Sequence, residues 1–133
     1  MPGVQDGPAS PLFSPLSFQG NTTLTELPSA GLSPEMAQAV GYAPDGDCVC
    51  WGIPFTVNSF AVLTSKPVTV QVTRARAEWL VVLHTSDLRP LQFNEDGFVS
   101  PTRGHGQLAE HAADYIVLYA DGSEERLPIR RRH

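Results

Sequence analysis

The clearest pattern in the sequence is the alternation Val68-Thr69-Val70-Gln71-Val72-Thr73. Successive side chains of a β-strand point to opposite faces, so the three valines would face a core while the polar residues face water. Strands with one apolar and one polar face are typical of antiparallel sheets. The pattern therefore predicts an all-β protein built from antiparallel strands.

Two further segments, residues 79–83 and 115–120, are apolar on both faces. The first is Trp79-Leu80-Val81-Val82-Leu83, which predicts a central, fully covered strand with Trp79 in the core. The second runs into Asp121-Gly122, a dipeptide that favours a tight hairpin turn, with residues 124–129 returning beside it. Pro128 donates no backbone hydrogen bond, so we expect that last strand to lie at a sheet edge.

The remaining elements are short and separated by turns, as expected for a chain with 11 Gly and 12 Pro. Residues 48–51 and 55–57 form two strand candidates around Gly52, and residues 21–27 and 60–63 form two more. Ser33 followed by Pro34 predicts one short helix. With about seven short strands and no βαβ unit, the pattern favours an antiparallel β-sandwich. We expect a Pro-rich arm or linker over residues 1–20 and a single sandwich domain over residues 21–133.

The charge distribution excludes some partners. The net charge is −5, and residues 1–60 contain five acidic side chains but no Lys or Arg. Without a basic stripe to contact phosphates, nucleic acid is not an expected partner. No apolar run approaches the roughly 18 residues of a membrane span, and residues 1–20 lack the pattern of a secretory signal. The sequence thus predicts no membrane contact and assigns no compartment.

Catalytic and metal-binding patterns are weak. Cys48 and Cys50 form a lone C-x-C, which predicts two buried thiols rather than a zinc site with four ligands. His105 and His111 with Glu110 lack metal-ligand spacing. No serine triad, glycosidase carboxylate pair or phosphate-binding glycine pattern is present. We therefore predict no catalytic residue, no metal, no cofactor and no enzymatic activity for this chain.

Three segments, in order, carry a resemblance. They are Gly52-Ile53-Pro54-Phe55, then residues 79–86 ending in His84-Thr85-Ser86, then residues 115–122 with the hairpin Tyr119-Ala120-Asp121-Gly122, ending at Leu127-Pro128-Ile129. Across residues 21–130 this order resembles the galactose-binding-like jelly-roll modules that accompany bacterial glycoside hydrolases and polysaccharide lyases. The resemblance implies a jelly-roll fold and an accessory, noncatalytic role. The Pro/Gly-rich stretch over residues 86–114 is longer than is common in those modules, so no site residue is transferred.

Candidate ligand-binding residues follow from the chemistry of sugar recognition, in which an aromatic ring stacks on a sugar face beside polar groups. Four residues meet these requirements in the sequence: Trp51 at a strand end, and Phe98, Arg103 and His105 in the long loop. For Trp51, packing in the core is the competing interpretation.

Two functional hypotheses remain. The first is a noncatalytic carbohydrate-binding or accessory module of a larger carbohydrate-active enzyme, with a polysaccharide or oligosaccharide and neighbouring domains of the parent protein as partners. The second is a structural interdomain or homo-oligomerisation β-sandwich with no small-molecule ligand.

Overall fold

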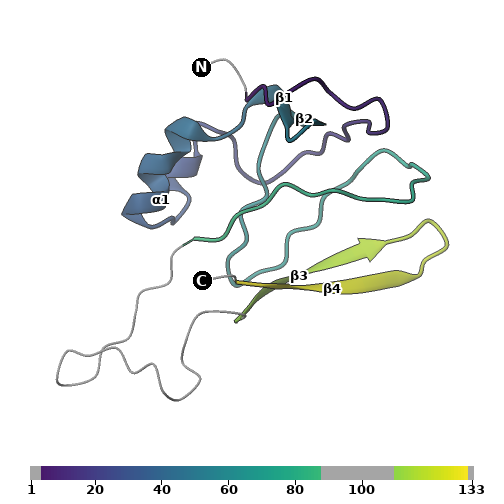
Figure 1. Ribbon diagram of the computed structural model, residues 1–133. Helices are drawn as coiled ribbons and strands as arrows, with labels where there is room; N and C mark the ends of the chain where they lie inside the picture. The colour runs from purple at the N-terminus through teal and green to yellow at the C-terminus, as the bar shows by residue number, and fades with distance from the viewer. Residues whose placement is uncertain (1–3, 88–109, 132–133) are drawn as a thin grey trace. The chain divides into compact units, whose positions relative to one another are not determined.

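The computed structural model of the chain describes residues 4–87 and 110–131 (Figure 1). The chain divides into two compact units, Met1–Glu78 and Trp79–His133. The regular structure of the described residues is mostly strand, in two small antiparallel sheets, with one short α-helix. The prediction of a small all-β protein is confirmed at this level.

The first unit contains the hairpin formed by β1 (Gly46–Cys50) and β2 (Ile53–Val57). The two strands pair antiparallel from Gly46 opposite Val57 to Cys50 opposite Ile53. The predicted strands around Gly52 are therefore confirmed. Few apolar side chains of the described residues are buried. Three of them are consecutive in β1, namely Cys48, Val49 and Cys50, and the fourth is Leu27.

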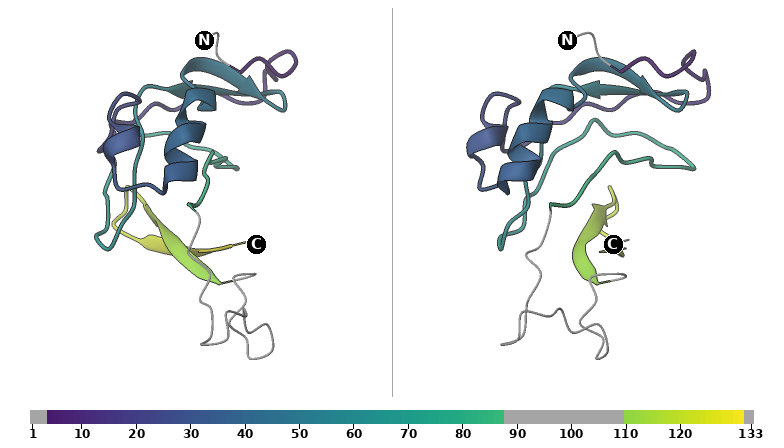
Figure 2. Two further views of the ribbon diagram at one scale, coloured as in Figure 1. Left: turned by 90° about the vertical axis from the view of Figure 1, so that its left-hand side faces the viewer. Right: turned by 60° about the vertical axis from the view of Figure 1, so that its left-hand side comes forward.

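The N-terminal residues run beside this hairpin, as Figure 2 shows. Val49 donates its amide to the Val4 carbonyl at 2.8 Å and accepts from the Asp6 amide at 2.9 Å. Gln5 thereby forms an isolated parallel bridge with Val49. The start of the predicted arm thus behaves as a third, minimal strand on β1, while its role as a linker stays a prediction.

The predicted helix is confirmed as α1 (Pro34–Ala39). The Ser33 hydroxyl accepts a hydrogen bond from the Met36 amide at 3.1 Å, and Pro34 fills the first turn, where no amide partner is needed. The helix is followed by a 3₁₀ turn, Val40–Tyr42, and another 3₁₀ turn, Leu27–Ser29, precedes it. No residue of α1 is buried, whereas Leu27 of the preceding 3₁₀ turn is.

The strands predicted over residues 21–27 and 60–63 are wrong, because a single bridge replaces them. Thr22 pairs antiparallel with Phe60, with N···O distances of 3.1 and 2.8 Å. Gly20 lies directly against the Phe60 carbonyl, and its amide donates to the Ser59 hydroxyl at 2.7 Å. This close approach of two chain segments requires a residue without a side chain at position 20.

The second unit contains the hairpin formed by β3 (His111–Leu118) and β4 (Glu124–Arg130). The turn between them is closed by hydrogen bonds from the Tyr119 amide to the Ser123 carbonyl and from the Gly122 amide to the Tyr119 carbonyl. Gly122 has a φ of 88°, which explains the preference for glycine there. The hairpin predicted from Asp121-Gly122 is confirmed, with Pro128 in an outer strand of a two-stranded sheet.

Two further predicted strands are not formed. Residues 68–73 and 79–84 lie outside every strand of the described residues, and Trp79 is 78% exposed instead of buried. The alternation is visible in side-chain burial only over residues 68–71, where Val68 and Val70 are half-buried and Thr69 and Gln71 are exposed, because Val72 is itself exposed. Periodicity predicts which face a strand would cover, but a strand exists only where a neighbour pairs with its backbone groups.

The jelly-roll sandwich stays a prediction, since it needs more than the two two-stranded sheets found among the described residues. Within residues 4–87 and 110–131, no helix has the length and apolar character to cross a bilayer.

Candidate functional site

The tip of the β1–β2 hairpin is formed by two residues, Trp51 and Gly52. Their φ angles are 51° and 77°, both in the left-handed region. Turns with two positive φ angles match the twist of the flanking strands, but they favour Asn, Asp or Gly. Trp51 is the one non-glycine residue with positive φ in the described part of the chain, so a bulky side chain occupies a backbone position that disfavours it.

Asp6 holds this tip in place. Its Oδ2 atom accepts a hydrogen bond from the Trp51 amide at 3.0 Å, and its backbone carbonyl accepts from the Gly52 amide at 3.1 Å. The Gly52 carbonyl in turn accepts from the Ser10 amide at 2.7 Å. The backbone of both turn residues is therefore fixed by the N-terminal segment. We call Trp51, Gly52 and Asp6 the tryptophan tip.

The Trp51 side chain is 82% exposed, so the core-packing interpretation of this residue is not supported. Because the backbone that carries this large apolar ring is fixed, little conformational entropy is lost when the ring contacts a ligand. Tyr42, at the end of its 3₁₀ turn, is equally exposed at 81%. Tyr42 has no positive φ, which makes it a matched reference for Trp51.

Polar side chains also lie on the same hairpin, away from its tip. The Thr56 hydroxyl donates to Asp47 Oδ1 at 2.9 Å across the β1–β2 pair, and Gln5 Nε2 donates to the Asp47 carbonyl at 3.2 Å. All three residues are exposed or half-buried. Hydroxyl, amide and carboxylate groups of this kind can form hydrogen bonds with a polyhydroxylated ligand.

The two cysteines of β1 belong to the core of the first unit. Both thiols are free and buried, as the sequence predicts. Burial raises the pKa of Cys48, and the neighbouring Cys50 thiol and the Asp47 carboxylate raise it further. Because the thiolate is the nucleophilic form, this raised pKa reduces the fraction of the Cys48 thiol in that form.

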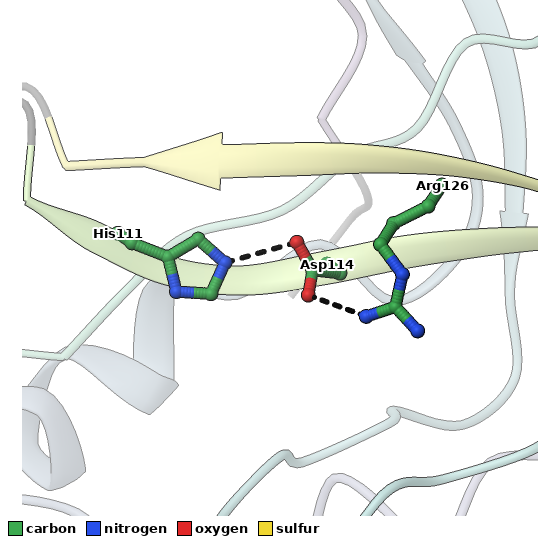
Figure 3. Close-up of polar contacts among 3 residues, drawn as sticks. All are labelled: His111, Asp114 and Arg126. Carbon is green, nitrogen blue, oxygen red and sulfur yellow. Dashed lines mark hydrogen bonds and ion pairs between the residues drawn. The ribbon is translucent and has the colours of Figure 1, made fainter.

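A second polar group lies on the β3–β4 hairpin and was not predicted from the sequence. Asp114 accepts hydrogen bonds from both sides, with His111 Nε2 2.9 Å from Oδ1 and Arg126 donating to Oδ2 at 2.9 Å (Figure 3). We call these three residues the hairpin polar cluster. The hydrogen bond with His111 is the main cause that lowers the pKa of Asp114, and the Arg126 guanidinium lowers it further.

A β-bulge explains why His111 and Asp114 meet. Residues three apart on a regular strand point to opposite faces, but the register shifts between His111 and Ala113, so that one extra residue reverses the alternation. Arg126 lies on β4 diagonally opposite Asp114, whose direct partner is Pro128. A bulge has no clear signal in the sequence, and for this reason the cluster was missed.

Of the predicted site residues, Trp51 lies at the tryptophan tip. The other three, Phe98, Arg103 and His105, lie outside the described residues. Among the residues that the structure does describe, no group of three or more His, Cys, Asp or Glu side chains could hold a metal ion.

Comparisons of the chain with protein families, curated proteins and solved structures find no match.

Proposed function

We propose that this chain is a noncatalytic carbohydrate-binding module in which the Trp51 ring is the stacking platform for a sugar. The observation that carries the proposal is the 82% exposure of Trp51 at a hairpin tip whose backbone is held by Asp6. An aromatic plane presented to solvent matches the apolar face of a pyranose ring, and nearby polar groups supply hydrogen bonds to its hydroxyls.

The strained backbone at Trp51 supports a binding role. A non-glycine residue in the left-handed region costs about 1–2 kcal/mol, whereas Asn or Gly would cost less at the same place. Residues held in unfavourable backbone conformations cluster at functional sites. A tryptophan that is both strained and exposed contributes little to folding, so a contact outside the fold is the better reason for its presence.

The wider assignment extends this proposal. Together with the segment order that resembles galactose-binding-like modules, the tryptophan tip supports a jelly-roll accessory module of a larger carbohydrate-active enzyme. In this proposal no residue of the chain takes part in bond cleavage, and the hydrolase or lyase chemistry belongs to neighbouring domains of the parent protein.

The test is affinity electrophoresis of the full chain through gels containing neutral or charged polysaccharides, with Trp51→Ala and Tyr42→Ala as matched variants. We expect retardation of the wild type and of Tyr42→Ala, and free migration of Trp51→Ala. Equal retardation of all three proteins would show that the platform lies elsewhere. Free migration of the wild type in every gel would exclude a carbohydrate-binding role for the chain.

A second candidate function, a structural or homo-oligomerisation module, is favoured by one feature of the β3–β4 hairpin. Three of its apolar side chains are 43–63% exposed: Ile116, Leu118 and Leu127. A two-stranded hairpin with exposed apolar residues is marginally stable alone and gains from a protein partner. Light scattering over a range of protein concentrations tests this alternative, which predicts a mass that rises above the monomer.

A further inference from the structure

The charge around the tryptophan tip restricts which saccharide can bind there. The five acidic residues of positions 1–60 are not balanced by any Lys or Arg in that range. Two of them belong to the hairpin region itself, because Asp6 contacts the Trp51 amide and Asp47 is part of β1. The β1–β2 hairpin and the segment bonded to its tip thus carry two carboxylates and no Lys or Arg, which favours a cationic ligand over an anionic one.

Asp6 contributes a carboxylate to the tryptophan tip. Its Oδ2 atom is occupied by the Trp51 amide, while its Oδ1 atom accepts no hydrogen bond within the described ranges 4–87 and 110–131. The residue is exposed, and its carboxylate is hydrogen-bonded to the backbone amide of Trp51. An ionised carboxylate oxygen accepts hydrogen bonds, most strongly from a cationic donor.

The indole ring has the same charge preference as the carboxylate. The face of an aromatic ring carries the negative part of its quadrupole, and tryptophan attracts cations over its face more strongly than tyrosine or phenylalanine does. A sugar carboxylate or sulfate stacked on Trp51 would be repelled by this negative surface and by the carboxylate bonded to the Trp51 backbone. A sugar amine would be attracted by both.

We propose that the tryptophan tip selects a saccharide bearing protonated amines, an amino-sugar polymer, and rejects polyuronates and sulfated glycans. This inference rests on the proposed carbohydrate-binding function and adds the charge class of the ligand. Asp6 is assigned as the specificity-determining residue, with Trp51 as the platform.

The experiment uses three oligosaccharides of equal length with the full chain: a glucosamine oligomer, its N-acetylated counterpart and a galacturonate oligomer. Binding is measured by calorimetry at a pH below the pKa of the sugar amines, so that these are protonated, at low and at high salt. Combining a surface ion pair with a cation–π contact, we expect the glucosamine oligomer to bind about fivefold more tightly than the acetylated one at low salt. This ratio should shrink at high salt because exposed charges are screened.

Asp6→Asn is the decisive variant. Its amide oxygen can still accept from the Trp51 amide, so the turn is retained while the charge is removed. We expect it to reduce the affinity for the glucosamine oligomer to that for the acetylated one and to leave the latter unchanged. Glu35→Gln, which removes one charge from α1, is the matched control and should preserve most of the preference.

Several results would overturn the inference. The charge class is wrong if the acetylated or galacturonate oligomer binds as tightly as the glucosamine oligomer, although the carbohydrate-binding function would then stand. An Asp6→Asn variant that keeps the full preference would remove Asp6 from its assigned role. If none of the oligosaccharides binds and the polysaccharide gels retard nothing, the proposed function itself fails.

Discussion

Replacing Trp51 by Asn should preserve or raise the stability of the fold but abolish carbohydrate binding. The substitution places an asparagine directly before Gly52, and Asn-Gly is the dipeptide that a turn with two positive φ angles favours. The backbone would keep its hydrogen bonds to Asp6, because these involve the amides of residues 51 and 52 and not the indole. We therefore expect the β1–β2 hairpin to form at least as readily as in the wild type.

The magnitude follows from two opposing contributions. Relief of left-handed strain at residue 51 stabilises the fold by part of the cost for a non-glycine residue, which is about 1–2 kcal/mol. Loss of the ring removes little burial, because Trp51 is 82% exposed and an aromatic side chain buries roughly 150–250 Å² when fully covered. The covered fraction corresponds to about 1 kcal/mol at about 25 cal/mol per Å².

The net change in the free energy of unfolding is thus close to zero or stabilising by up to about 1 kcal/mol, which raises the Tm by as much as about 5 °C for a unit of this size. Circular dichroism melts of the full chain measure this change. Tyr42→Asn is the matched control, since Tyr42 is equally exposed but has no positive φ, and we expect no rise in its Tm.

In the same samples, Trp51→Asn should lose carbohydrate binding while Tyr42→Asn retains it. A fall of more than about 5 °C in the Tm of Trp51→Asn would refute the reasoning, because it would mean that the ring packs into the fold. A rise in Tm with unaltered binding would confirm the strain but remove Trp51 from the binding site.

Three further predictions concern folding and titration. Gly20→Ala should destabilise the fold by about 1–3 kcal/mol in chemical denaturation, because a methyl group would collide with the Phe60 carbonyl; an unchanged midpoint would contradict that close approach. Asp114→Asn should lower the stability at neutral pH and reduce the further loss of stability in acid. The lowered pKa of Asp114 stabilises the folded state at pH values above the ordinary carboxyl pKa of 3.8, and this stability is lost as the pH falls through the lowered pKa. Urea denaturation at several pH values measures the change. Identical acid profiles of the variant and the wild type would argue against the hairpin polar cluster. The hydrogen bond from Tyr119 to Glu125 raises the phenol pKa above 10.0, so phenolate absorbance should show Tyr119 ionising at a higher pH than a free tyrosine. The stability from this hydrogen bond is present below pH 10.0 and is lost as the pH rises through the raised pKa. The step assigned to Tyr119 should be the one that disappears from that absorbance titration in Tyr119→Phe.

Local turn and cap chemistry predicted the elements that depend on neighbours in the chain. Asp121-Gly122 and Gly52 each supply a backbone conformation that closes a hairpin, and Ser33 with Pro34 starts a helix within one turn. These signals are decided over a few residues, so the sequence alone contains them.

Long-range pairing could not be predicted in the same way. The valine alternation over residues 68–73 and the apolar run over residues 79–83 describe faces that could be covered, but they carry no information about which strand would pair with them. The expected burial of Trp79 failed for this reason, since it presupposed neighbours on both faces of a central strand.

The sequence predicted only part of the candidate site. An aromatic residue beside Gly52 indicated a strand end, and from this the sequence could nominate Trp51. Its exposure depends on the φ angles of the turn and on Asp6, which lies 45 residues away in the chain. The hairpin polar cluster depends on a single extra residue near His111, and no residue type marks that bulge.

The most direct test of the binding role of Trp51 uses Trp79→Phe, which leaves Trp51 as the single tryptophan of the chain. Indole fluorescence and its quenching by acrylamide are followed while a glucosamine oligomer is added. Stacking of a sugar on the exposed ring predicts a saturable change in emission and a loss of quenching, with the same midpoint as binding measured by calorimetry. An oligomer that binds in calorimetry while emission and quenching stay constant would contradict the assignment of Trp51 as the platform.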